Sequence, residues 1–98
     1  MTNNTIEELD LSIKGLTKLP DLTKYTNLKK LNCSENKLTH LDNLPINLTE
    51  LNCSYNKLTH LDNLPINLTT LYCFDNSLTY DFNPTLENIR KYNKKKLI

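Results

Sequence analysis

A duplicated segment with a period of 20 residues constrains the fold of this chain more than any other feature. Residues 31–49 read LNCSENKLTHLDNLPINLT, and residues 51–69 repeat 18 of these 19 positions, with Tyr55 in place of Glu35. A shorter copy, LYCFDNSLT, follows at 71–79, and a diverged copy precedes the pair. Repetition at a fixed period of 20 to 50 residues indicates a solenoid, in which each unit packs only against its neighbours.

The spacing within each unit predicts a short strand followed by a turn. Leu31 and Cys33 are two residues apart, so both side chains fall on one face of a strand. Stacked units pair such strands in parallel, about 4.8 Å apart. An asparagine three residues later can hydrogen-bond backbone groups that the turn leaves unpaired. We therefore expect two structural ladders, one of Cys33, Cys53 and Cys73 and one of Asn36, Asn56 and Asn76.

The rest of each unit is a short return arm. Leu38, Leu41 and Leu44 follow one another at a spacing of three, and Pro45 comes next. Twenty residues leave no room for a full helix beside a strand, and proline favours an extended chain. We expect each arm to be extended or 3₁₀-like.

These spaced positions resemble the leucine-rich repeat, whose pattern is L-x-x-L-x-L-x-x-N/C-x-L. The 20-residue period and the Leu-Pro pair are similar to the short repeats of bacterial secreted effectors and of giant-virus or amoebal repeat proteins. The resemblance implies an α/β-type leucine-rich-repeat solenoid, right-handed, with a short parallel β-sheet on its concave face and extended or 3₁₀ convex arms. It implies one domain over 1–98, with repeats at about 6–27, 28–47, 48–67 and 68–85 and a C-terminal cap at 86–98.

The C-terminal segment can close the stack in one of two ways. Leu86 and Ile89 match the first two leucine positions of a fifth unit, but Lys91 stands at the third, and lysine is poorly suited to a core. The segment is therefore a partial strand or a helix, for which Thr85 is a candidate N-cap. We favour a cap helix.

The concave face of the sheet is the candidate binding surface, because side chains alternate along each strand and the polar ones point away from the core. Three aromatic residues, Tyr55, Tyr72 and Phe74, gather near its C-terminal end, and exposed aromatics are typical binding anchors. The alternative is that Phe74 packs under the cap. The residues we expect to contact a partner are Tyr55, Tyr72, Phe74, Asn32, Asn52, Lys30, Glu50 and Asp75.

The potential metal ligands and nucleophiles have simpler explanations than catalysis. A parallel ladder points the three cysteines side by side, whereas zinc needs ligands that converge, so core packing is favoured over a metal site or a redox disulfide. His40 and His60, each followed two residues later by an aspartate, suit a solvated edge better than a metal or pH-dependent contact. No phosphate loop, nucleophile elbow or metalloprotease motif is present. We expect a non-catalytic protein–protein interaction module without a cofactor or metal.

Charge is distributed unevenly along the chain. Residues 1–85 carry a net charge of −3 and residues 86–98 carry +4. A basic tail can contact nucleic acid, an anionic membrane or an acidic protein, but one Lys-Lys-Lys run is weak evidence, and we favour a solubilising role. Self-association through the last strand is a further alternative, so we expect a monomer or a weak homo-oligomer.

The location follows from two absences in the sequence. No apolar run approaches the roughly 20 residues of a membrane span, and the N-terminus MTNNTIEELD lacks the basic start and apolar run of a signal peptide. We therefore expect a cytoplasmic protein. The many Asn, Lys, Ile and Tyr residues, with no Ala or Val, suggest an AT-rich genome such as that of an amoebal giant virus or a microbe.

Overall fold

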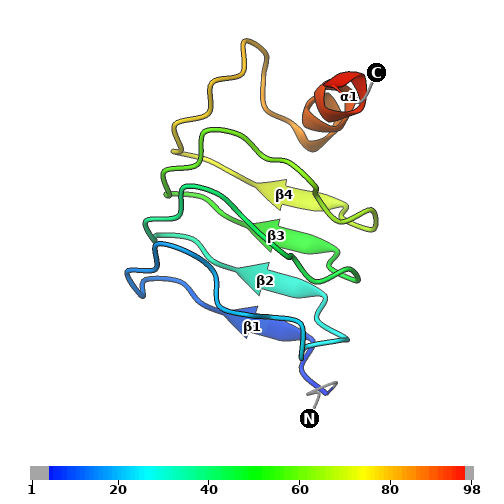
Figure 1. The fold of residues 1–98 in the computed structure, drawn as a ribbon. Helices are drawn as coiled ribbons and strands as arrows, with labels where there is room; N and C mark the ends of the chain where they lie inside the picture. The colour runs from blue at the N-terminus through cyan, green and yellow to red at the C-terminus, as the bar shows by residue number, and fades with distance from the viewer. Residues whose placement is uncertain (1–4, 97–98) are drawn as a thin grey trace.

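Short parallel strands, one from each repeat unit, form a single sheet in residues 5–96, which are the residues that the computed structural model describes (Figure 1). The strands follow one another in sequence order, and Leu9, Leu31, Leu51 and Leu71 occupy equivalent positions across the sheet. The predicted parallel pairing is therefore confirmed. Within residues 5–96 the elements are β1 (Glu8–Asp10), β2 (Lys30–Asn32), β3 (Glu50–Asn52), β4 (Thr70–Tyr72) and helix α1 (Leu86–Lys96).

The core lies between the sheet and the return arms. Leu51 and Cys53 point inward from β3 and the residue that follows it, and Leu58 and Leu68 meet them from the arm; all four are buried. The same positions of the preceding unit repeat this packing. Burying a leucine side chain contributes roughly 1.5–3 kcal/mol, so stacked leucines are the main source of stability in a chain with so little other apolar surface.

The return arms contain turns and bends, and within the described residues no helix interrupts them. Each of the two duplicated arms has one 3₁₀-type turn, in which Leu48 N–H donates to Pro45 O at 3.2 Å and Leu68 N–H donates to Pro65 O at 3.1 Å. The arms are otherwise irregular. Proline explains this arrangement, because it lacks the N–H that a longer helix would use.

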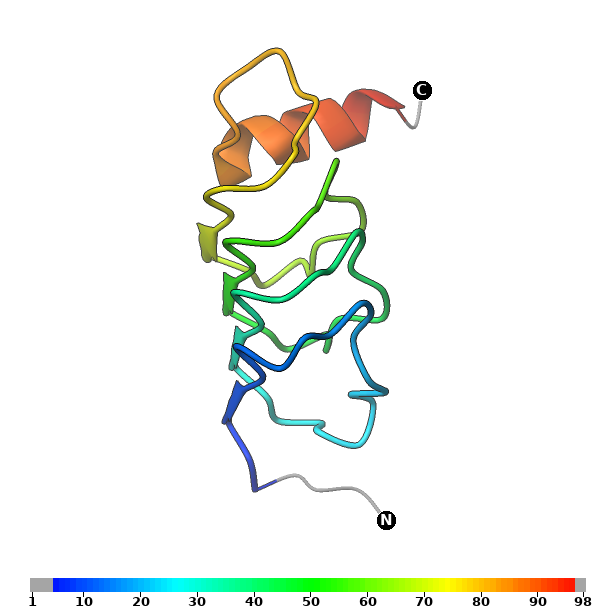
Figure 2. The same cartoon turned by 90° about the vertical axis from the view of Figure 1, so that its left-hand side faces the viewer.

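Helix α1 closes the C-terminal end of the stack, where Figure 2 shows it crossing beyond β4. Thr85 caps it, since Asn88 N–H donates to Thr85 Oγ1 at 3.2 Å, and Ile89 is fully buried. The predicted cap helix is confirmed and the alternative of a fifth strand is wrong; residues 97–98 of the expected cap lie outside the described residues. Neither α1 nor any other stretch of residues 5–96 forms a helix long and apolar enough to cross a membrane.

Candidate functional site

The asparagine ladder holds successive units together at the turn that follows each strand. The Asn56 amide donates to Cys33 O at 3.0 Å and to Cys53 O at 3.1 Å, and its Oδ1 accepts from Leu38 N–H at 3.0 Å. Asn36 and Asn76 make equivalent bonds one unit before and one unit after. The asparagines thus occupy the structural position that their spacing predicts.

The cysteine ladder is structural rather than reactive. Cys33 and Cys53 are fully buried, and all three thiols are free. Burial raises the pKa of Cys33 to about 12, and burial followed by the neighbouring thiols raises the pKa of Cys53 well above its ordinary value. Protonated thiols are poor nucleophiles and poor metal ligands. Among residues 5–96, no three His, Cys, Asp or Glu side chains gather in a group that could hold a metal ion.

Cys73 departs from the ladder because it is only half-buried. A loop covers it instead of a further strand, and its Sγ lies 3.5 Å from Pro84 O. Cys73 still packs against the core, at its edge. The difference arises because the stack ends one strand after β3, so Cys73 has a strand on one side only.

Two aromatic side chains stand out from the face of the sheet at β4. Tyr72 is 42% exposed and Phe74 is 64% exposed, and their ring centroids are 6.4 Å apart. Tyr55, which is 56% exposed, joins them through the backbone, since its N–H donates to Phe74 O at 2.7 Å. The alternative that Phe74 packs under the cap is wrong, because most of its ring faces solvent.

Four of the five polar residues expected on the sheet face line one shallow hollow of about 310 Å³, and Asp75 does not. Glu50 is half-exposed there, whereas Asn32 already uses its Oδ1 to accept from Ser34 N–H at 3.0 Å and Ser34 Oγ at 2.7 Å. Asn52 likewise accepts from Ser54 N–H. Both asparagines therefore offer mainly their NH₂ groups to a partner. The hollow is lined by Glu8, Leu9, Asp10, Lys30, Leu31, Asn32, Glu50, Asn52 and Tyr72.

Two serines follow the strands that carry the sheet face. Alternation predicts that Ser34 and Ser54 face the concave surface, and the Ser34 hydroxyl does donate to the Asn32 side chain of that face at 2.7 Å. Both serines are nevertheless buried. Ser54 Oγ accepts from Phe74 N–H at 2.9 Å, so this buried hydroxyl positions an exposed aromatic residue of the next unit.

One further row of exposed side chains lies at the strand ends, where the spacing of the repeat predicts Glu35, Tyr55 and Asp75 but not Ile13. Ile13, Glu35, Tyr55 and Asp75 occupy the equivalent position of their units, and all have left-handed backbone conformations, with φ between 53° and 57°. The N–H groups of the first three donate to the next unit, at 2.7–3.3 Å. The substitution of Tyr55 for Glu35, the one difference between the duplicated segments, marks this row in the sequence.

The two histidines lie on an exposed edge and make separate pairs. His40 Nε2 lies 3.1 Å from Asp42, and His60 Nε2 lies 3.2 Å from Asp62. Asp62 also pairs with Lys96 of α1 at 3.3 Å. Each imidazole therefore contacts the aspartate of its own unit, and the second pair helps to attach the cap.

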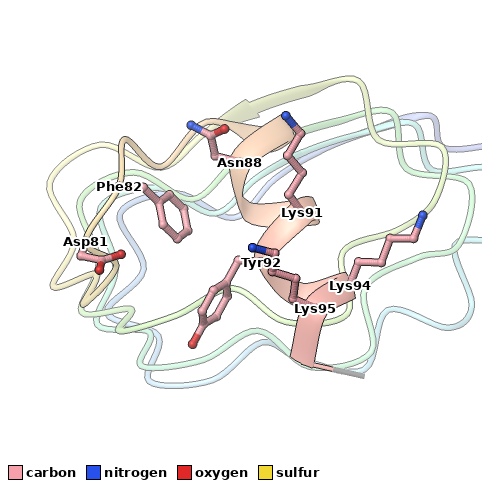
Figure 3. Close-up of a pocket in the computed structure, with 7 residues that line it drawn as sticks. All are labelled: Asp81, Phe82, Asn88, Lys91, Tyr92, Lys94 and Lys95. Carbon is pink, nitrogen blue, oxygen red and sulfur yellow. The ribbon is translucent and has the colours of Figure 1, made fainter. Parts of the chain in front are cut away.

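A second hollow, of about 610 Å³, lies between α1 and the loop before it (Figure 3). Its two aromatic rings, Phe82 and Tyr92, have centroids 5.7 Å apart. The ring of Tyr80 packs on both, 4.7 Å from Phe82 and 5.3 Å from Tyr92. Tyr80 also receives Leu61 N–H on its hydroxyl at 2.7 Å. The cluster therefore closes the end of the stack. The hollow is lined by Asp81, Phe82, Asn88, Lys91, Tyr92, Lys94 and Lys95.

Several basic side chains of α1 make contacts within the molecule. Arg90 donates to Pro65 O at 2.8 Å, and Lys91 pairs with Glu87 one turn earlier at 3.2 Å. The bonds from Arg90 to Pro65 and from Lys96 to Asp62 fasten α1 to the last complete unit, whereas the Lys91–Glu87 pair lies within the helix. Within the described part of the chain, Lys94 and Lys95 are left without an ion pair.

Comparisons of the chain with protein-family models, with curated proteins and with solved structures found no match.

Proposed function

We propose that this chain is a small leucine-rich-repeat protein whose sheet face binds a protein or peptide without catalysing a reaction. The observation that carries the proposal is the exposed aromatic pair formed by Tyr72 at the end of β4 and Phe74 just after it, next to Tyr55. Exposed aromatic side chains bury a large area on binding. They also have few rotatable bonds and so lose little conformational entropy, which makes them effective anchors.

The surroundings of the pair support the same role. The hollow over β1–β4 begins at Tyr72 and extends to Glu8, so a ligand anchored on the rings can continue across the sheet. Reactive chemistry has little support, since the two buried thiols have raised pKa values. We place the protein in the cytoplasm, where free thiols stay reduced.

Selection from a displayed library of random peptides tests this function. The wild-type chain is expected to enrich peptides that the double variant Tyr72→Ala/Phe74→Ala does not retain. The matched control is Ile46→Ala/Ile66→Ala, which removes two exposed apolar side chains from the return arms, 73% and 84% exposed, and should retain the same peptides. Equal retention by both folded double variants would refute binding at the sheet face.

A further inference from the structure

In the row Ile13, Glu35, Tyr55 and Asp75, the left-handed backbone is unsuited to the first three side chains, whereas aspartate tolerates it. A left-handed φ costs a residue with a Cβ roughly 1–2 kcal/mol, and a β-branched or aromatic residue is especially disfavoured there. Glycine would remove the cost. Residues held in such conformations are concentrated at functional sites.

The return arms of the same molecule provide the comparison. Their left-handed positions, at φ 53° and 54°, are occupied by Asn43 and Asn63, and asparagine tolerates this conformation. The chain therefore uses a compatible residue where only the backbone matters. At three of the four strand-end positions it instead carries isoleucine, glutamate or tyrosine, which this backbone disfavours, so these side chains serve a purpose other than making the turn.

The sheet face and the row together are acidic. Lys30 is their only basic residue among the described residues, and it already pairs with Glu8 at 3.4 Å. Glu35, Glu50 and Asp75 have no ionic partner in residues 5–96. The carboxylates on the face are Glu8, Asp10, Glu35, Glu50 and Asp75, which with Lys30 give a formal charge of −4.

We propose that the partner is an extended segment rich in arginine and lysine, which lies across β1–β4 along the row Ile13, Glu35, Tyr55 and Asp75. This inference rests on the proposed function and names the chemistry of its ligand. Unpaired carboxylates attract a basic segment and raise its association rate. A guanidinium group can also stack on the exposed rings of Tyr72 and Phe74.

The length of the row limits the segment it contacts. Neighbouring strands lie about 4.8 Å apart, so the row spans about 14 Å, which is the length of about five extended residues. Its ends differ in chemistry, because Ile13 is apolar and Asp75 is charged, with Glu35 and Tyr55 between them. The row can therefore select the direction as well as the composition of the segment.

Fluorescence anisotropy with two labelled decapeptides tests the proposal, one alternating arginine with threonine and the other alternating glutamate with threonine. At about 50 mM salt only the arginine peptide is expected to bind. The variant Glu35→Gln/Glu50→Gln should bind it about fivefold more weakly or worse, because each exposed ion pair contributes a few-fold. The control Asp42→Asn/Glu87→Gln makes the same change of charge away from the sheet face and should stay within about twofold of wild type.

The variant Tyr55→Gly tests the row itself. It should weaken binding of the arginine peptide while leaving the unfolding free energy equal or higher, because glycine relaxes the left-handed backbone. Unchanged binding by Tyr55→Gly, equal binding of the two peptides, or equal weakening by the two charge variants overturns the proposal.

Two further results separate this inference from its alternatives. If the library yields peptides that require Tyr72 and Phe74 but contain no excess of arginine or lysine, the proposed function stands and the basic partner is wrong. The other alternative is that the basic helix α1 of a second copy binds the sheet face. Light scattering of the chain alone tests for such a dimer. A dimer that Glu35→Gln/Glu50→Gln dissociates would assign the surface to self-association and overturn the proposal.

Discussion

Each buried asparagine of the ladder serves two units at once. Asn56 binds Cys53 O of its own unit and both Cys33 O and Leu38 N–H of the unit before it. A backbone group left unpaired in the interior costs free energy comparable to a lost hydrogen bond or more. The side chain therefore replaces, at the turn, the bonds that the sheet provides along the strands.

The variant Asn56→Ala should lower the unfolding free energy by about 2–4 kcal/mol, because it leaves several buried backbone groups without partners. Denaturation in urea, followed by circular dichroism, measures the loss. Asn67→Ala is the matched control, since Asn67 is an exposed arm residue one unit repeat after Asn47, and it should change stability by less than about 0.5 kcal/mol. Similar losses for the two variants would contradict the proposed role of the ladder.

At this scale the sequence predicts a residue's position better than its conformation. The spacing of Leu51, Cys53 and Asn56 predicts which side chains point inward, because leucine and the strand period together determine burial. It does not predict the left-handed φ of Tyr55, since glycine or asparagine would be the usual signal for it. It also does not predict that Ser54 is buried, because the hydroxyl of Ser54 is contacted by Phe74 N–H of the next unit.

Among the elements of residues 5–96, α1 is the one whose placement does not follow from the repeat period. Thr85 and the apolar pair Leu86 and Ile89 predict that a helix forms here. The closure by Tyr80, Phe82 and Tyr92 was not predicted, because Tyr92 reaches the other two rings only through the angle at which α1 crosses the stack. Periodicity within a unit contains no information about that angle.

The variant Ile89→Ala should destabilise the chain by about 2–5 kcal/mol, because it opens a cavity where α1 contacts the core. Lys95→Ala is the control on the same helix: it removes an exposed side chain, and alanine is the strongest helix former. Thermal unfolding of the two variants measures the contribution of the cap. If Ile89→Ala unfolds at the wild-type temperature, α1 does not stabilise the stack.

For the whole molecule, the buried thiols make stability depend on pH. The folded pKa of Cys33, about 12, lies above its ordinary value of 9.0, so the folded state retains a proton that the unfolded state loses. The contribution is complete below about pH 9 and is lost as the pH rises toward 12. We expect this thiol to lower the unfolding free energy by about 1.4 kcal/mol for each pH unit above 9.

Urea denaturation under reducing conditions, from neutral pH to about pH 10, tests this dependence. The variant Cys33→Ala should lose stability less steeply with pH than the wild type, whatever constant difference its smaller side chain introduces. Parallel curves for the two proteins would show that the thiol is not held protonated by the fold.

The constant register of the sheet makes the length of this protein adjustable. From β2 onward each strand meets the next after 20 residues, and the junctions between units are nearly identical in sequence. Recombination between the two matching gene segments would add or delete a whole unit, and neighbouring units would still meet through the same kinds of residues. The row Ile13, Glu35, Tyr55 and Asp75 would then gain or lose one side chain. A single recombination event would thus change the length of ligand that the protein contacts.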